Sequence, residues 1–241
     1  MPLAEKWRAI TAIGNGVLKG TGEHFQYRLG YVTGEDAAAL VRLQGQILTV
    51  APRPLPLYVR DEGYFVRCAE DAGCIVGVWH DGRLIAYSVL QVPAEGEENY
   101  GVLMGLPEDE LRCVGHAAGS GVHPDYRGNE FHKSMIVLRN DFALDNGYVH
   151  LCGEVLPSNP VSIRNHLSRG FFLKGFKVDK FDLDAYLLHK DLRVAPTLAD
   201  EATQEWDVTD VDWYRRMLGD GYWGFRLSKR GDWLLTCGRF A

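Results

Sequence analysis

A turn of Tyr126-Arg127-Gly128-Asn129 lies between a short apolar segment and a helical pattern. The first amides of a helix have no partner within the helix, and the helix dipole gives them partial positive charge. Such a turn can therefore hold an anion, and Arg127 can add a charged hydrogen bond to it. Glu130 follows at a position where a phosphate cradle favours glycine. A solvated turn is the simpler interpretation of these residues.

The elements that would position this turn are predicted from periodicity. The segment before it, residues 111–123, has the composition of a strand. After it, Phe131, Met135, Leu138 and Phe142 recur at i, i+4, i+7 and i+11, which predicts an amphipathic helix that Gly147 would end from a C′ position.

Two more helices are predicted from their capping residues. Thr33, with Asp36 as its capping-box partner, would begin a helix that reaches about residue 50. Asn159 is a natural N-cap with Pro160 at the next position, and Gly170 would stop that helix.

The remaining elements are strands and turns. Asp81-Gly82 is a strong two-residue turn signal between two apolar runs and predicts a β-hairpin. Residues 51–58 contain three prolines and are expected to form a loop. The other strand-like segments are residues 24–32, 148–155, 172–181 and 186–192.

Composition excludes several classes of protein. The chain has 241 residues, five cysteines without a CxxC pair, and a net charge of −6 that gives no reason to expect nucleic acid or an anionic membrane as partner. Free buried thiols in a reducing compartment are expected. The N-terminus lacks the pattern of a secretion signal, and no apolar run approaches the ~20 residues that span a bilayer. A soluble, cytoplasmic protein without a metal is expected.

Two segments carry a resemblance to a known family. Residues 122–136, VHPDYRGNEFHKSMI, are similar to motif A of the GNAT superfamily of acyl-CoA-dependent N-acetyltransferases, although Glu130 and His132 stand where that motif usually has glycine. Residues 159–172, NPVSIRNHLSRGFF, are similar to motif B, in which an Asn begins a helix that ends in Gly-Phe twelve residues later. The order of elements over residues 25–192 resembles the family as well.

The resemblance implies an α+β fold of mixed αβα layers. Its central sheet would be mostly antiparallel and splayed between its fourth and fifth strands, and a helix with a β-hairpin would extend it at the C-terminus. The implied organisation is an N-terminal segment of residues 1–24, a GNAT-like acetyltransferase domain of residues 25–192, and an extension of residues 193–241.

The resemblance also implies acetyl-CoA as co-substrate. Its pyrophosphate would lie on the amides that follow Arg127, where Lys133 and His132 could offset the charge of Glu130. The strand before the turn would pair with pantetheine, or its glycines would serve packing alone. Asn159 would contact pantetheine, cap its helix, or do both. The residues predicted to bind acetyl-CoA are Ser120, Gly121, Val122, Arg127, Gly128, Asn129, Glu130, Phe131, His132, Lys133, Asn159 and Ser162.

Acetyl transfer to an amine needs an oxyanion donor, an acid for the thiolate and a base. An N–H near Val122 would face the thioester oxygen. His166 stands where the family often places a general-acid Tyr, and could instead be a solvent-facing histidine. Glu154, in an otherwise apolar strand, is the candidate base or the member of a structural ion pair. His116 and His123 are lesser candidates, and a water chain could replace them all.

The implied activity is transfer of an acetyl group from acetyl-CoA to a primary amine of a small molecule or peptide, by direct attack in a ternary complex. A non-catalytic acyl-CoA-binding or regulatory module, and an acyltransferase that takes a longer acyl-CoA, are the alternatives. The last 46 residues hold four of the six tryptophans, so they are expected to fold. Their predicted hairpin, turning at residues 229–231, would cover the core and contribute to a homodimer.

Overall fold

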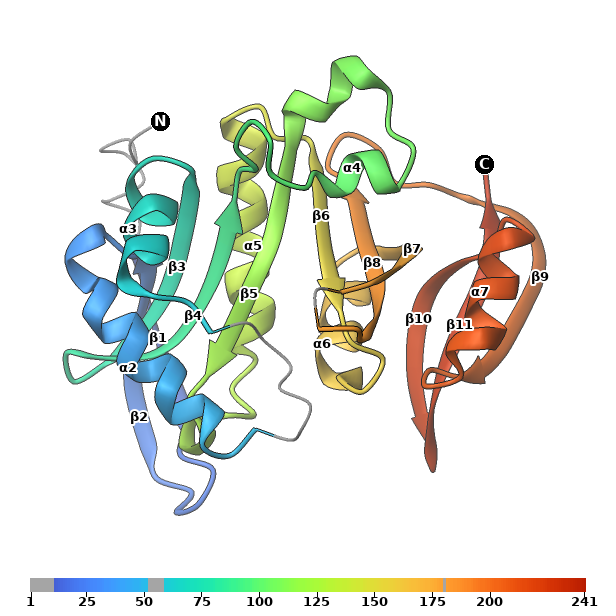
Figure 1. Cartoon of the computed structure of the whole chain (residues 1–241). Coiled ribbons are helices and arrows are strands. Elements are labelled where there is room, and N and C mark those ends of the chain that lie inside the picture. The colour runs from blue at the N-terminus through green and yellow to red at the C-terminus, as the bar shows by residue number, and fades with distance from the viewer. Residues whose placement is uncertain (1–10, 52–58, 180) are drawn as a thin grey trace. The chain divides into compact units, whose positions relative to one another are not determined.

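The structure is a computed structural model that describes residues 11–51, 59–179 and 181–241. The chain forms two compact units, one of residues 1–97 and 115–147 and one of residues 98–114 and 148–241. We call them unit 1 and unit 2. Each mixes strands with helices, as Figure 1 shows. The expected α+β class is therefore confirmed. The expected domain limits stay a prediction, and so does the splay of the sheet.

Unit 1 is built on five antiparallel strands in the order β1-β2-β3-β4-β5. Helices α2 and α3 pack on one face of β3 and β4 around Ile75, Tyr87 and Val89. The opposite face, which carries Ser88, is covered by α5. The elements are β1 Thr11–Val17, β2 His24–Tyr31, α2 Ala37–Leu48, α3 Glu62–Glu70, β3 Gly73–His80, β4 Arg83–Gln91, β5 Val114–Val122 and α5 Phe131–Asp145.

Unit 2 carries six antiparallel strands in the order β6-β8-β7-β10-β11-β9. Its elements are α4 Tyr100–Leu103, β6 His150–Val155, α6 Pro160–Leu167, β7 Phe172–Val178, β8 Asp184–Asp191, β9 Leu198–Asp207, α7 Val211–Gly219, β10 Trp223–Arg230 and β11 Asp232–Phe240. Short 3-10 turns lie at Gly34–Asp36, Glu108–Cys113 and Pro124–Tyr126.

The predicted turns and caps are confirmed where the structure describes them. Asp81 and Gly82 both take positive φ, of 47° and 72°, as a two-residue hairpin turn requires. The Thr33 amide donates to Asp36 Oδ2 at 3.3 Å. The Asn159 side chain accepts from the Ser162 amide at 3.2 Å and caps α6.

Three elements differ from expectation. Strand β1 lies in a Gly-rich segment that carried no prediction. Helix α3 follows the proline-rich stretch, in residues for which no helix was predicted, and the proline-rich residues 52–58 lie outside the described residues. Strand β9 occupies the acidic stretch after Pro196, where the sequence shows no apolar alternation.

The five cysteines are free, and all except Cys113 are buried. In the part of the chain that the structure describes, no helix is long and apolar enough to cross a membrane. No group of three or more His, Cys, Asp or Glu side chains that could hold a metal ion occurs among the same residues.

Candidate active site

The predicted site residues fall into two groups, one in each unit. Residues 120–133 form a continuous strand–turn–helix segment of unit 1, at the end of β5 and the start of α5. The backbone of this segment turns sharply at two residues with positive φ, Gly128 at 95° and Glu130 at 59°. Glu154, Asn159, Ser162 and His166 belong to unit 2.

Glu130 adopts the backbone conformation that explains why motif A favours glycine at its position. It is the N-cap residue of α5 and lies in the left-handed region, which costs a residue with a side chain about 1–2 kcal/mol. The Ser134 amide donates to the Glu130 carbonyl at 3.1 Å, so the helical ladder begins there. The amides of residues 131–133 precede the first donor of that ladder and face outward from the helix end. The segment therefore keeps the shape of an anion cradle despite the substitution.

The charge of Glu130 is balanced within the first turn of α5. Its exposed carboxylate lies 2.6 Å from Lys133 Nζ. The expectation that Lys133 offsets Glu130 is confirmed. His132 contributes no charge, because burial of its ring and the nearby Arg139 lower its pKa to about 3. The expectation that His132 also offsets Glu130 is therefore wrong, since the imidazole is neutral at physiological pH.

Asn129 has a structural task that was not predicted. Its Oδ1 accepts from the Val17 amide at 2.8 Å, and its Nδ2 donates to the carbonyls of Val17 and Tyr126 at 2.9 and 3.0 Å. The amide side chain thereby joins the turn to the end of β1. A contact from Asn129 to a ligand would consequently come from its backbone.

Strand β5 contains the irregularity that its glycines predict. Val89 pairs with Gly119 and Leu90 with Ala117, so Ala118 is an extra residue, and Gly119 takes φ 141°. A β-bulge is confirmed here. Gly121 also serves packing, because a Cβ at this position would lie 2.5 Å from Ile47 Cδ1.

The amide of Val122 points away from β4. His123, the next residue, donates to the Ile85 carbonyl of β4 at 2.9 Å. Amides alternate in direction along an antiparallel strand, so the Val122 N–H is directed to the other edge of β5. This orientation is the one that a ligand running along that edge requires. Arg127 nearby is exposed, with Nε 3.4 Å from the Val122 carbonyl oxygen.

The two histidines of β5 and its turn differ as candidate bases. His116 is buried in the strand. For His123, partial burial and the neighbouring Arg83 guanidinium lower the pKa, which keeps the imidazole neutral at physiological pH. The Asp125 amide donates to its Nδ1 at 3.4 Å.

Glu154 takes part in the ion pair that was its alternative interpretation. Its mostly buried carboxylate lies 3.6 Å from Lys177 Nζ, and Lys177 also contacts Glu98. The ion pair fixes the position of Glu154 on β6.

His166 is buried on α6, so the solvent-facing alternative is wrong. Its Nδ1 donates to the Ser162 carbonyl at 2.9 Å, and its ring packs on Phe171 in a T-shaped arrangement with centroids 5.1 Å apart. These contacts fix the ring and its tautomer, so a proton exchanged with a ligand would be carried on Nε2.

Two clusters of buried or paired charged side chains were not predicted from the sequence. In unit 1, Arg139 is fully buried and donates to Ser88 Oγ at 3.1 Å. In unit 2, His150 contacts Glu110 Oε2, and Arg193 bridges Glu110 and Asp191 at 3.1 and 2.7 Å. Burial alone would raise the pKa of Asp191, but hydrogen bonds from Arg193 outweigh it and lower the pKa to about 2.

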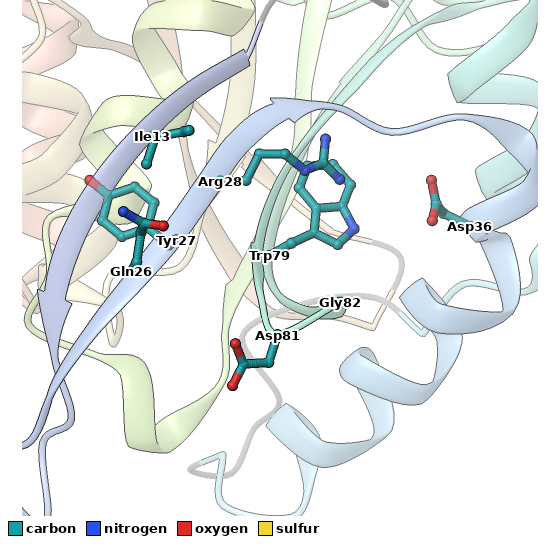
Figure 2. Close-up of a pocket in the computed structure, with 8 residues that line it drawn as sticks. All are labelled: Ile13, Gln26, Tyr27, Arg28, Asp36, Trp79, Asp81 and Gly82. Carbon is teal, nitrogen blue, oxygen red and sulfur yellow. The ribbon is translucent and has the colours of Figure 1, made fainter.

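A pocket of about 460 Å³ opens elsewhere in unit 1, at β1, β2 and the β3–β4 turn. Figure 2 shows Arg28 beside the Trp79 ring, with its Cζ 3.8 Å from the ring centroid. None of the predicted site residues lines this pocket. Its lining residues are Ile13, Gln26, Tyr27, Arg28, Asp36, Trp79, Asp81 and Gly82.

Comparison with solved structures gives the fold a name. The GNAT domain of S. lividans PAT is similar at a TM-score of 0.54 and 20% identity, over 79% of this chain and 99% of that one. A ribosomal-protein-alanine N-acetyltransferase from Brucella melitensis gives 0.51 and 18%, over 68% and 99%. A GCN5-related N-acetyltransferase from Kribbella flavida gives 0.51 and 15%, over 69% and 98%.

The chain therefore has the GNAT acetyltransferase fold, and the resemblance carried by the two motifs is confirmed at the level of the fold. No family model and no curated protein matches the sequence.

Proposed function

We propose that this protein is an N-acetyltransferase that transfers the acetyl group of acetyl-CoA to a primary amine of a small molecule or peptide. The observation that carries the proposal is the turn before α5. On a GNAT fold, Gly128 and Glu130 take the positive φ values that present the first amides of α5, and Lys133 neutralises the carboxylate of Glu130. Backbone amides and a helix N-terminus are suited to the pyrophosphate of a nucleotide cofactor.

In this proposal, β5 and α5 bind acetyl-CoA. The pyrophosphate lies on the amides of residues 128–133, with Arg127 as a further donor. The outward-pointing amide of Val122 donates to the thioester oxygen, and Asn159 and Ser162 of α6 contact pantetheine.

Residues of unit 2 supply the proton transfers of the proposed reaction. The amine attacks the thioester carbon directly, Glu154 accepts a proton from it, and His166 protonates the departing thiolate. Lys177, whose Nζ lies 3.6 Å from Glu154 Oε2, holds the carboxylate in place.

Release of free thiol from acetyl-CoA tests the proposal. The purified protein is mixed with acetyl-CoA and a panel of small amines and N-terminal peptides, and thiol appearance is followed together with acetylated product. Amine-dependent thiol release supports an acetyltransferase. Tight binding of acetyl-CoA without turnover on any acceptor would favour a non-catalytic acyl-CoA-binding module, and turnover restricted to longer thioesters would favour another acyltransferase.

The affinity for acetyl-CoA depends on Arg127 in this proposal. Arg127→Ala is expected to weaken binding by ~1–3 kcal/mol, the range for loss of a charged hydrogen bond. Isothermal calorimetry measures the change, with Arg42→Ala, an exposed arginine of α2, as the matched control. An unchanged dissociation constant would place the pyrophosphate elsewhere.

Glu130→Gly is expected to have the opposite effect. It removes the carboxylate, releases Lys133 for the ligand and relieves the left-handed backbone at this position. Binding should become tighter, and the gain should be larger at low ionic strength, where charges are least screened. A calorimetric salt series measures it. Equal affinity of the two proteins at every salt concentration would show that residue 130 does not face the anion.

A further inference from the structure

Arg139 is a cation buried without a counter-ion. Its side chain is fully buried in α5, and among the described residues it has no ion-pair partner, while Nε and Nη2 have no hydrogen-bond partner. Burial lowers its pKa to about 10, so the guanidinium stays charged at neutral pH. Cys74 is the neighbouring acid, but burial raises its pKa far above neutrality and keeps it protonated. An arrangement of this kind costs folding free energy and therefore calls for a functional explanation.

Among the described residues, the side chain of Arg139 makes one hydrogen bond, and that bond begins a chain that leads to β5. Its Nη1 donates to Ser88 Oγ at 3.1 Å, and Ser88 Oγ lies 2.7 Å from Ser120 Oγ. Ser88 and Ser120 are direct cross-strand partners on β4 and β5. The backbone bond from His123 to Ile85 makes Ala86 and Val122 a non-hydrogen-bonded pair. Pair types alternate along an antiparallel ladder, so Ser88 and Ser120, two residues away, form the same kind of pair, in which side chains come closest.

The direction of this chain of hydrogen bonds follows from burial. Ser88 is fully buried and already accepts a hydrogen bond from Arg139. Among the described residues its own O–H has one acceptor, Ser120 Oγ. A buried hydroxyl needs an acceptor, so Ser88 donates to Ser120. The positive charge of Arg139 strengthens that bond.

Ser120 then has its own O–H to donate elsewhere. It is half-buried, in contrast to Ser88, and lies two residues before Val122, whose amide points to the edge of β5 that faces away from β4. The β-bulge at Ala118 immediately precedes this part of the strand. The Ser120 oxygen accepts the hydrogen bond from Ser88, which Arg139 strengthens. The Ser120 hydroxyl is therefore a preorganised donor to a ligand at that edge.

We propose that Ser120 is a catalytic hydrogen-bond donor to the thioester oxygen, and that Arg139 and Ser88 are positioning residues that aim its hydroxyl. The inference rests on the proposed acetyltransferase function. When the amine nitrogen bonds to the thioester carbon, the carbonyl π pair moves to oxygen, and Ser120 and the Val122 amide stabilise that negative charge. When the C–S bond breaks, the electron pair leaves with sulfur, which takes up a proton, and the acetylated nitrogen loses one. Ser120 keeps its proton throughout.

The test compares chemistry with binding in three variants of the full chain. Ser120→Ala is expected to lower the single-turnover rate of acetyl transfer by about 10-fold, the effect of one hydrogen bond when the Val122 donor remains. Its affinity for CoA, which lacks the carbonyl, should not change. Ser120→Thr keeps the hydroxyl and should restore most of the rate. Arg139→Met should lower the rate as well, while its melting temperature stays equal to or rises above that of the parent, because an unpaired buried charge is removed.

Ser168→Ala is the matched control, because Ser168 ends α6 with an exposed hydroxyl and has no place in the proposed machinery. An active parent protein whose rate is unaltered by Ser120→Ala overturns the role of Ser120. A loss of CoA affinity equal to the loss of rate also overturns it, since Ser120 would then bind pantetheine. An inactive parent protein instead contradicts the proposed acetyltransferase function, so the two failures are distinguishable.

Discussion

Removal of residues 196–241 is expected to unfold unit 2. The segment supplies β9, α7, β10 and β11, and its side chains are part of the core of that unit. The Tyr214 hydroxyl donates to the Leu173 carbonyl at 2.7 Å, and the Tyr186 hydroxyl donates to the Val208 carbonyl at 2.6 Å. Truncation would leave Tyr186 buried beside a void or exposed to water. The buried residues that would be lost are Val208, Tyr214, Leu227, Leu235, Thr236 and Cys237.

Light scattering and thermal unfolding measure the effect of the truncation. The shortened protein should aggregate or lose its cooperative transition, because an exposed core and an unpaired β7 edge favour association. A truncated chain that stays monodisperse and melts at the parent temperature would show that the segment is dispensable. The same light-scattering experiment gives the molecular mass of the parent protein. That mass tests the homodimer, which is still a prediction.

Point variants within residues 196–241 separate the contribution of buried side chains to stability from that of exposed ones. Tyr214→Ala is expected to lower the free energy of unfolding by about 3–5 kcal/mol, because a fully buried aromatic ring and its hydrogen bond are removed. Trp206→Ala is the matched control, since Trp206 is an exposed aromatic residue on the edge strand β9. Denaturant unfolding should show a smaller loss for this variant, which gives up stacking on Trp213 and a hydrogen bond to Asp210 but no buried ring.

The elements with local signals were predicted correctly from the sequence. The Asp81-Gly82 turn, the Asn159 cap and the bulge at the glycines of β5 each depend on a few adjacent residues, and each appears where it was expected. Strand β9 was missed for the opposite reason. Most of its residues are exposed at the edge of the sheet, so it needs no apolar alternation and its pairing with β11 alone defines it.

The contacts of the candidate site depend on partners distant in sequence. Asn129 was read as part of an anion-binding turn, but its side chain is held by Val17, 112 residues away. Arg139 follows Met135 by four positions and so falls on the buried face of α5, yet a count of apolar residues passes over an arginine there. His132 was assigned a charge that burial removes. In each case the residue type was visible in the sequence, and the environment that decides its chemistry was not.

Substitution of His166 is expected to have the largest effect on the chemical step. If His166 protonates the departing thiolate, His166→Ala should lower kcat by roughly 10²-fold, as loss of a general acid does, with little change in acetyl-CoA affinity. Because the ring is buried against Phe171, loss of packing must be separated from loss of the proton. His166→Asn serves this purpose, since its amide can still donate to the Ser162 carbonyl but cannot titrate.

If His166 is a general acid, His166→Ala and His166→Asn should have similar single-turnover rates even if their melting temperatures differ. The pH–rate profile of each variant should also lack one limb that the parent's profile shows, because the titrating group is gone. Val161→Ala, an exposed change on the same helix, is the control for effects on α6 itself. If His166→Asn restores the parent rate, the histidine is a positioning residue that acts through its bond to Ser162. The proton for the thiolate would then come from another group or from water.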